Sequence, residues 1–209
     1  MEFNNKNIRL YASLPQTRAL GPYTRFAVWV QGCPQSCAGC MTPAAQSEEG
    51  GSLIAIEALS QQIIATPNIE GLTVSGGEPF SQADALGSLL EKIKSRRDLG
   101  VIVYTGYHSD ELRQLAADKK EIAKLLNMID LLIDGPYIET LNDGLSLRGS
   151  ANQGLHLLTE RYANVIEKHY CQPRRAVELH LHDREVLLAG IPGRELAEIV
   201  NTAGFKRSA

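Results

Sequence analysis

Three of the chain's four cysteines lie in one short segment, Gln31-Gly32-Cys33-Pro34-Gln35-Ser36-Cys37-Ala38-Gly39-Cys40. Their spacing, C-x3-C-x2-C, lets a loop turn three thiolates toward one soft metal centre. A closed structural zinc site normally uses four ligands, and the sequence offers no evident fourth ligand nearby. A [4Fe–4S] cluster held by three cysteines would leave one iron free to bind another molecule. The segment therefore predicts a metal centre, with zinc and iron–sulfur as the two alternatives.

Length and composition indicate one globular domain, or one domain with a small appendage, in the 209 residues. The chain is 44% hydrophobic and 22% charged, which is ordinary for a globular protein. The net charge of -3 argues against electrostatic binding of nucleic acid. We see no membrane span and no signal peptide. Three clustered cysteines and a lone Cys171 favour a reducing cytoplasm over a disulfide framework.

The cysteine segment follows a short apolar run that is rich in β-forming residues, Phe26–Val30. We predict that this run is a buried first strand, followed by a helix over 53–65 and a second strand over 71–75. The second strand leads directly into Gly76-Gly77-Glu78-Pro79. Two glycines let the backbone approach a ligand closely. Glu78 is therefore expected at the carboxyl end of a strand, where α/β proteins build their sites.

Further strands and helices alternate along the chain, which predicts a parallel sheet. We expect helices over 82–96, 109–117 and 119–127, and strands over 101–104 and 128–134. Thr105 and Asp134 then stand at two more strand ends. An isolated aspartate before Gly-Pro is also a common turn former, so the pattern alone leaves both interpretations of Asp134 open.

The combination of the cysteine spacing with a later Gly-Gly-Glu-Pro resembles the radical S-adenosylmethionine (SAM) enzymes. In that family the three cysteines hold a [4Fe–4S] cluster, and the open iron is chelated by the amino and carboxylate groups of SAM. Reductive cleavage of SAM then gives a 5′-deoxyadenosyl radical. The resemblance implies that Cys33, Cys37 and Cys40 are cluster ligands. It also implies that the segment Gly76, Gly77, Glu78 and Pro79 contacts the methionine part of SAM.

Other segments are similar to one subgroup, the activating proteins of anaerobic ribonucleotide reductase. Gly39 stands where many radical SAM enzymes have an aromatic residue, and Thr105-Gly106-Tyr107 and the Asp134-Gly135 pair match segments of the subgroup. Residues 148–153 match its R-G-S-x-N-Q segment. The resemblance implies that Thr105, Asp134, Arg148 and Asn152 also take part in cofactor binding. It covers roughly residues 22–155 and implies an open, partial (β/α) barrel of the radical SAM type.

The resemblance fades after residue 160, so we expect a core over 1–160 and a C-terminal extension over 161–209 that packs on the same domain. Alternation of apolar residues predicts a β-hairpin from 176–182 and 186–190, followed by a helix over 194–203. His180 and His182 share one face of the first hairpin strand. We interpret them as strand histidines rather than as a metal site. The tail either recognises a partner or completes the sheet.

Three functions remain open on the sequence. The first is a radical SAM activase that removes a hydrogen atom from a glycine Cα of a partner, such as anaerobic ribonucleotide reductase. Its electrons would come from a flavodoxin- or ferredoxin-type donor. The second is radical SAM modification of a ribosomal peptide or a small molecule. The third is a non-catalytic metal-binding module. No catalytic residue is assigned beyond the cluster.

Overall fold

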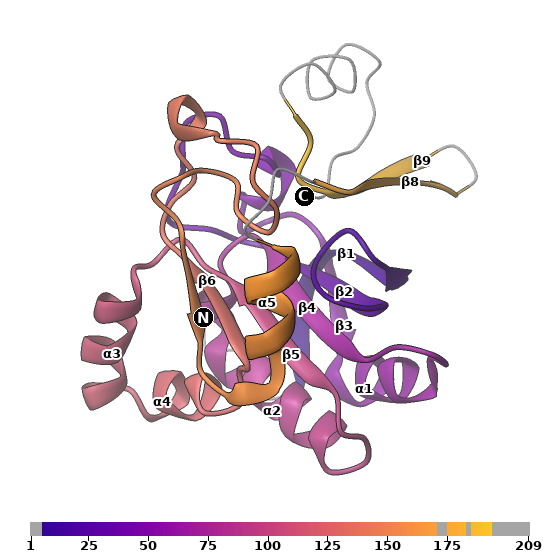
Figure 1. Ribbon diagram of the computed structural model, residues 1–209. Helices are drawn as coiled ribbons and strands as arrows, with labels where there is room; N and C mark the ends of the chain where they lie inside the picture. The colour runs from indigo at the N-terminus through magenta and orange to yellow at the C-terminus, as the bar shows by residue number, and fades with distance from the viewer. Residues whose placement is uncertain (1–5, 171–174, 183–184, 194–209) are drawn as a thin grey trace.

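The computed structural model describes residues 6–170, 175–182 and 185–193, and its centre is a mixed seven-stranded sheet (Figure 1). In chain order the strands are β1 (Asn7–Thr17), β2 (Arg25–Val30), β3 (Ser52–Ala55), β4 (Gly71–Gly76), β5 (Gly100–Tyr104), β6 (Leu131–Asp134) and β7 (Gly154–Leu157). In space the order is β3-β1-β2-β4-β5-β6-β7. The fold is therefore α/β, as the alternation of strands and helices predicted.

The four central strands β2, β4, β5 and β6 are parallel to one another, and β1, β3 and β7 are antiparallel to their neighbours. Parallel strands end on the same edge of a sheet, where α/β proteins bind their ligands. This arrangement brings four segments to one edge. They are the cysteine segment after β2, Gly77-Glu78 after β4, Thr105 after β5, and Asp134 at the end of β6.

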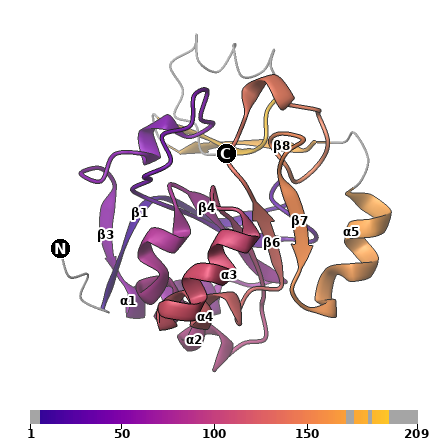
Figure 2. The same cartoon turned by 90° about the vertical axis from the view of Figure 1, so that its left-hand side faces the viewer.

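Four helices cover one face of the sheet, as Figure 2 shows. They are α1 (Ile56–Ala65), α2 (Ala83–Lys94), α3 (Ser109–Asp118) and α4 (Lys120–Leu126). Their apolar side chains pack on alternate residues of the strands, such as Val28, Val74 and Val103, which are completely buried. Side chains along a strand point alternately to its two faces, so the residues between these form the opposite face.

The opposite face is covered by the C-terminal part of the chain. Helix α5 (Ala163–His169) packs through Ile166 on Ile102 and Ile133. A separate hairpin of β8 (Val177–His182) and β9 (Glu185–Gly190) packs through Ala189 on Trp29. This hairpin confirms the predicted one.

Arg25 stabilises the end of the sheet at which the parallel strands begin, opposite to the end that carries the cysteine segment. Its guanidinium is completely buried and forms an ion pair with Glu70 at 2.8 Å. It also donates hydrogen bonds to the Tyr162 hydroxyl at 2.8 Å and to the Gly100 carbonyl oxygen at 2.9 Å. Each buried donor therefore meets an acceptor, which burial of a charge requires. The network joins the segment before α5 to three strands.

Several predicted boundaries differ from the structure. The predicted first strand is β2, and it is preceded by β1, an 11-residue strand in a region where the sequence shows little periodicity. The predicted helix over 53–65 begins only at Ile56, because residues 52–55 form β3 beside β1. The short elements β7 and α5 were not predicted. Residues 194–203, where we predicted a helix, lie outside the described residues.

The sheet has two free edges, β3 and β7, so no closed barrel forms among the described strands. Within the described ranges, no helix has the length and apolar character needed to cross a membrane.

Candidate metal centre

The cysteine loop is held by backbone hydrogen bonds to the segment that follows it. The Gly32 amide donates to the Ala45 carbonyl oxygen at 2.8 Å, and the Cys33 amide donates to the Gln46 carbonyl oxygen at 3.0 Å. The buried side-chain amide of Gln31 donates to two further carbonyl oxygens of that segment, at 2.6 and 3.0 Å. The two ends of the loop are therefore fixed together.

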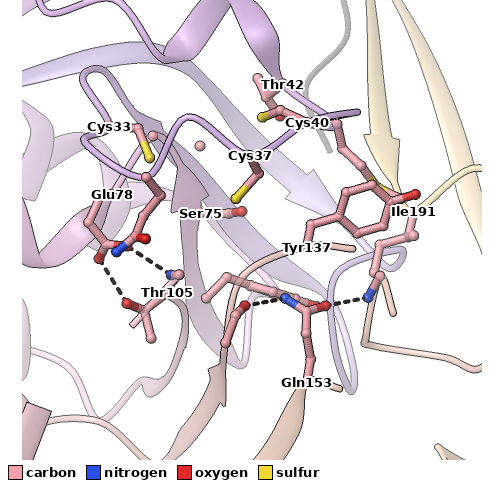
Figure 3. Close-up of a pocket in the computed structure, with 18 of the residues that line it drawn as sticks. Cys33, Cys37, Cys40, Thr42, Ser75, Glu78, Thr105, Tyr137, Gln153 and Ile191 are labelled. Atoms are coloured by element: carbon pink, nitrogen blue, oxygen red, sulfur yellow. Dashed lines mark hydrogen bonds between the residues drawn. The ribbon is translucent and has the colours of Figure 1, made fainter. Parts of the chain in front are cut away.

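The structure brings the three predicted cysteines to one pocket. Cys33, Cys37 and Cys40 are all half-buried free thiols, and all three line it (Figure 3). Burial is the main cause that raises the pKa of the Cys33 and Cys40 thiols. No group of His, Cys, Asp and Glu side chains in the described part of the chain converges as a single metal ion would require. A cuboidal cluster binds each of its cysteines through a different iron, so the donor set of three thiols fits such a cluster.

Gly39 has a physical reason to be glycine. Its φ is +73°, a conformation that side chains strongly disfavour. A Cβ atom there would lie 2.9 Å from Oε2 of Glu139. An aromatic side chain at this position would therefore strain the turn.

The Gly-Gly-Glu segment is joined to the start of the cysteine loop. The Gly77 amide donates to the Val30 carbonyl oxygen at 2.7 Å, and the Glu78 amide donates to the Gly32 carbonyl oxygen at 2.8 Å. A Cβ atom on Gly77 would lie only 2.2 Å from that same Gly32 oxygen. Gly76 has a φ of +100°, and a Cβ there would meet the Val30 backbone at 2.6 Å. Both glycines are therefore needed for the two loops to touch.

Glu78 is completely buried at the wall of the pocket. Oε1 accepts hydrogen bonds from the Phe80 amide and the Thr105 hydroxyl, both at 2.9 Å, and Oε2 accepts one from the Gly106 amide at 2.8 Å. Burial raises the pKa of this carboxyl to about 7, against the opposing effect of the three donors. A carboxylate has about four acceptor sites, so Glu78 keeps capacity for one more donor.

The other predicted cofactor residues divide into two groups. Gly76, Gly77 and Thr105 line the pocket together with Glu78. Pro79 is buried at the start of a short 3-10 helix, Pro79–Gln82, and is not among the lining residues. The proline ring suits the first position of a helix.

Asp134, Arg148 and Asn152 do not line the pocket. The Asp134 carboxylate accepts hydrogen bonds from the Ser109 amide at 2.6 Å and the Gly154 amide at 3.0 Å. These bonds join α3, β6 and β7. Arg148 pairs with Asp143, and the Asn152 side chain donates to the Pro136 carbonyl oxygen at 2.7 Å. Asp134 and Asn152 therefore join neighbouring segments around the pocket, whereas Arg148 forms an ion pair within its own loop.

Several lining residues were not predicted as site residues. Gln153 accepts a hydrogen bond from the Gly149 amide at 2.7 Å and donates one to the Gly135 carbonyl oxygen at 2.8 Å, which closes one wall. Its position inside the R-G-S-x-N-Q segment was the available signal. Tyr137 and Ile191 also line the pocket (Figure 3). No local motif marks Ile191, because it reaches the pocket only through the packing of β9.

Comparison with known proteins gives the family. The family described as "4Fe-4S single cluster domain" matches residues 19–156. The anaerobic ribonucleoside-triphosphate reductase-activating protein of Vibrio cholerae is 36% identical over 148 residues, which cover 66% of this chain and 91% of that protein. The chain belongs to the family of these activating proteins. The Salmonella typhi member is 31% identical over 160 residues, covering 72% of this chain and 99% of that protein. The Escherichia coli K12 member is 31% identical over 147 residues, which cover 66% of this chain and 91% of that protein.

Membership confirms the predicted relationship and identifies the chain as an enzyme of the radical SAM activase type, with a 4Fe-4S domain. The match to the 4Fe-4S family spans the sheet from β2 to β7 and ends at residue 156. Helix α5 and the β8–β9 hairpin lie beyond it. The activase core is therefore shared with the relatives, whereas the elements that cover the opposite face of the sheet follow the matched region.

Proposed function

We propose that this protein generates a glycyl radical on a partner enzyme of the anaerobic ribonucleotide reductase type, by reductive cleavage of SAM. The observation that carries the proposal is the contact between the two loops. The cysteine loop and Gly76–Glu78 share backbone hydrogen bonds and line one pocket. A site that uses a cluster to cleave a bound cofactor needs the cluster ligands and the cofactor ligands side by side.

In this proposal Cys33, Cys37 and Cys40 hold a [4Fe–4S] cluster, which supplies the electron for cleavage of SAM to a 5′-deoxyadenosyl radical. Gly76 and Gly77 leave the backbone bare at the pocket wall, so that the methionine part of SAM can lie against it. Glu78 offers its remaining acceptor site to the amino group of that methionine. Thr105 orients the Glu78 carboxylate through its hydroxyl. The three thiols therefore fit the cluster, and Glu78 with the bare glycine backbone fits the methionine part of SAM.

Asp134, Arg148 and Asn152 take a supporting place in the proposal. Their hydrogen bonds fix the loops after β6 and before β7, from which Gly135, Gly149 and Gln153 reach the pocket. The open sheet, with parallel strands delivering these loops to one edge, suits the partial barrel of the radical SAM type. An oxygen-sensitive cluster suits a reducing cytoplasm, with a flavodoxin- or ferredoxin-type protein as the electron donor.

The test is anaerobic reconstitution with iron and sulfide, followed by dithionite and SAM. We expect a brown protein that forms 5′-deoxyadenosine. Addition of an anaerobic ribonucleotide reductase encoded in the same genome should give the electron paramagnetic resonance doublet of a glycyl radical. Protein that binds zinc without sulfide would overturn the proposal. Formation of 5′-deoxyadenosine without radical transfer to the reductase would redirect it to a peptide or small-molecule substrate.

A further inference from the structure

The pocket has two unlike sides, as Figure 3 shows. Glu78 and Thr105 lie on one side, and Tyr137 and Ile191 lie on the other. SAM is an extended molecule, with its amino and carboxylate groups at one end and its adenine at the other. When Glu78 holds the methionine part, as proposed above, the adenosyl part has the rest of the pocket to occupy. The side that carries Tyr137 is therefore where a group that binds a planar base is expected.

Two tyrosines, Tyr104 and Tyr137, supply the aromatic rings among the described residues that line the pocket. The Tyr104 ring packs with Ile102 and Ile133 on the face of the sheet opposite α1–α4, and its hydroxyl is buried. Tyr137 is only half-buried, and it belongs to none of the apolar clusters in the described part of the chain. Its ring is therefore not committed to packing in the core.

The Tyr137 ring rests on bare backbone. A Cβ atom on Gly149 would lie 2.8 Å from Cδ2 and 3.2 Å from Cε2 of the ring, so a side chain there would displace it. The Asn142 side-chain amide donates a hydrogen bond to the Tyr137 hydroxyl at 3.4 Å. Arg175 holds both supports, because its guanidinium donates to Asn142 Oδ1 at 2.7 Å and to the Gly149 carbonyl oxygen at 3.2 Å. These contacts preorganise the ring.

The R-G-S-x-N-Q segment also fixes the backbone on both sides of Tyr137. The Asn152 side chain donates a hydrogen bond to the Pro136 carbonyl oxygen at 2.7 Å. The hydroxyl of Ser150, a completely buried residue, accepts one from the Ile138 amide at 3.1 Å. One segment therefore provides the glycine under the ring and two side chains that hold the residues before and after it. Its effect on the pocket is exerted through Tyr137.

We infer that Tyr137 binds the adenine of SAM by stacking its ring on the base, and that Ser150 and Asn152 are positioning residues for Tyr137. A rigid aromatic ring suits this task, because every base presents a π-face on which such a ring can stack. Leu20 and Ile191 add apolar surface to the same pocket. Glu78 and Tyr137 would then hold SAM at its two ends. This inference rests on the proposed function.

The experiment compares Tyr137→Phe, Tyr137→Leu and Tyr137→Ala with the wild type, and Leu141→Ala is the control. Leu141 lies in the same loop, and it is 44% exposed. Equilibrium dialysis measures the Kd for SAM on reconstituted protein without reductant, so that SAM stays intact, and the iron content is measured in parallel. We expect the Leu and Ala variants to raise the Kd about fivefold or more. The Phe variant and the control should stay within about twofold of wild type, with unchanged iron throughout.

Several results would overturn the stacking role. A leucine variant that binds SAM as tightly as the phenylalanine variant would show that the ring only fills space. An unchanged Kd together with a lower radical yield on the reductase would assign the ring to the protein partner. Loss of iron in the Leu variant would assign it to the cysteine loop. A wild type that binds SAM but forms no glycyl radical would instead refute the proposed function, and the comparison of Kd values would stand.

Ser150→Ala tests the positioning role. The Ile138 amide loses its acceptor, so it should exchange with deuterium about fivefold faster in the apoprotein, while the amides of β5 keep their rates. In reconstituted protein the substitution should raise the Kd for SAM about threefold, but leave it unchanged in a Tyr137→Leu background, because the ring that Ser150 positions is absent there. Unchanged exchange at Ile138, or an equal effect on the Kd in both backgrounds, would overturn this role.

Discussion

The Glu78 amide donates a hydrogen bond to the Gly32 carbonyl oxygen at 2.8 Å, directly before the first cysteine of the loop. This bond connects the ends of β2 and β4, which are neighbouring parallel strands. Because both loops start from one rigid sheet, the thiols and the buried carboxylate keep a fixed relationship. Such preorganisation is what a reaction between two bound groups requires.

Replacement of one cysteine should remove the cluster and the chemistry together. Cys37→Ala is expected to abolish the brown chromophore and 5′-deoxyadenosine formation, because two thiolates cannot hold the cluster. The matched control is Ala38→Ser, at an exposed neighbouring position. Absorption near 400 nm and product analysis measure the two effects. Normal SAM cleavage in Cys37→Ala would show that the ligand set is wrong.

Glu78→Gln should weaken SAM binding and leave the iron content unchanged. Since burial raises the pKa of the wild-type carboxyl to about 7, its ionised fraction falls as the pH drops below 7. The Kd for SAM should therefore rise on acidification in the wild type, whereas the Gln variant should show a flatter profile. Equilibrium dialysis at several pH values measures both. Loss of iron in the variant would assign Glu78 to the cluster instead.

Gly77→Ala should destabilise the protein, because its Cβ would lie 2.2 Å from the Gly32 carbonyl oxygen. Moving two backbones apart is costly, and we expect a loss of about 1–3 kcal/mol in the free energy of unfolding. The control is Gly87→Ala inside α2, where the nearest atom would be 3.6 Å away. There alanine should stabilise by up to about 1 kcal/mol. Denaturant unfolding of the apoproteins compares them, and equal stabilities would contradict the steric argument.

Acidification should weaken the attachment of the β8–β9 hairpin to the end of β1, because the Glu178 carboxylate accepts the hydrogen bonds that join them. Burial alone would raise the pKa of this carboxyl, but hydrogen bonds from Thr17, Arg18 and His180 outweigh it and lower the pKa. A lowered pKa in the folded state means that the stabilisation is present above the unfolded value of 4.5 and is lost as the pH falls through the folded value. The protection of the β8 amides, taken relative to their intrinsic exchange rates, should therefore fall as the pH drops below 4.5. Glu178→Gln should show fast exchange already at neutral pH, and protection that is equal in both proteins would refute this anchor.

Part of the candidate site can be predicted from the sequence, because some of its residues are close together along the chain or follow a predictable strand. Cys33, Cys37 and Cys40 are close along the chain, so their convergence needs only a local turn. Glu78 follows a strand that is predictable from its apolar run. By contrast, the prediction that Asp134 and Asn152 bind the cofactor depends on a motif match and, for Asp134, on its place at a strand end, and neither residue lines the pocket. Whether a side chain at a strand end faces the pocket or a neighbouring loop depends on nearby amides, such as that of Ser109 for Asp134.

The sequence by itself determined the parallel core, the thiol triad and the glycines beside Glu78, because these depend on periodicity and on residues that are near one another in the chain. Only the tertiary structure decided that β1 lies between β2 and β3 and that Ile191 reaches the pocket. Both depend on pairing and packing between segments far apart in the chain. The free energy of such contacts comes from the surfaces that meet, and no local pattern records which surfaces those are.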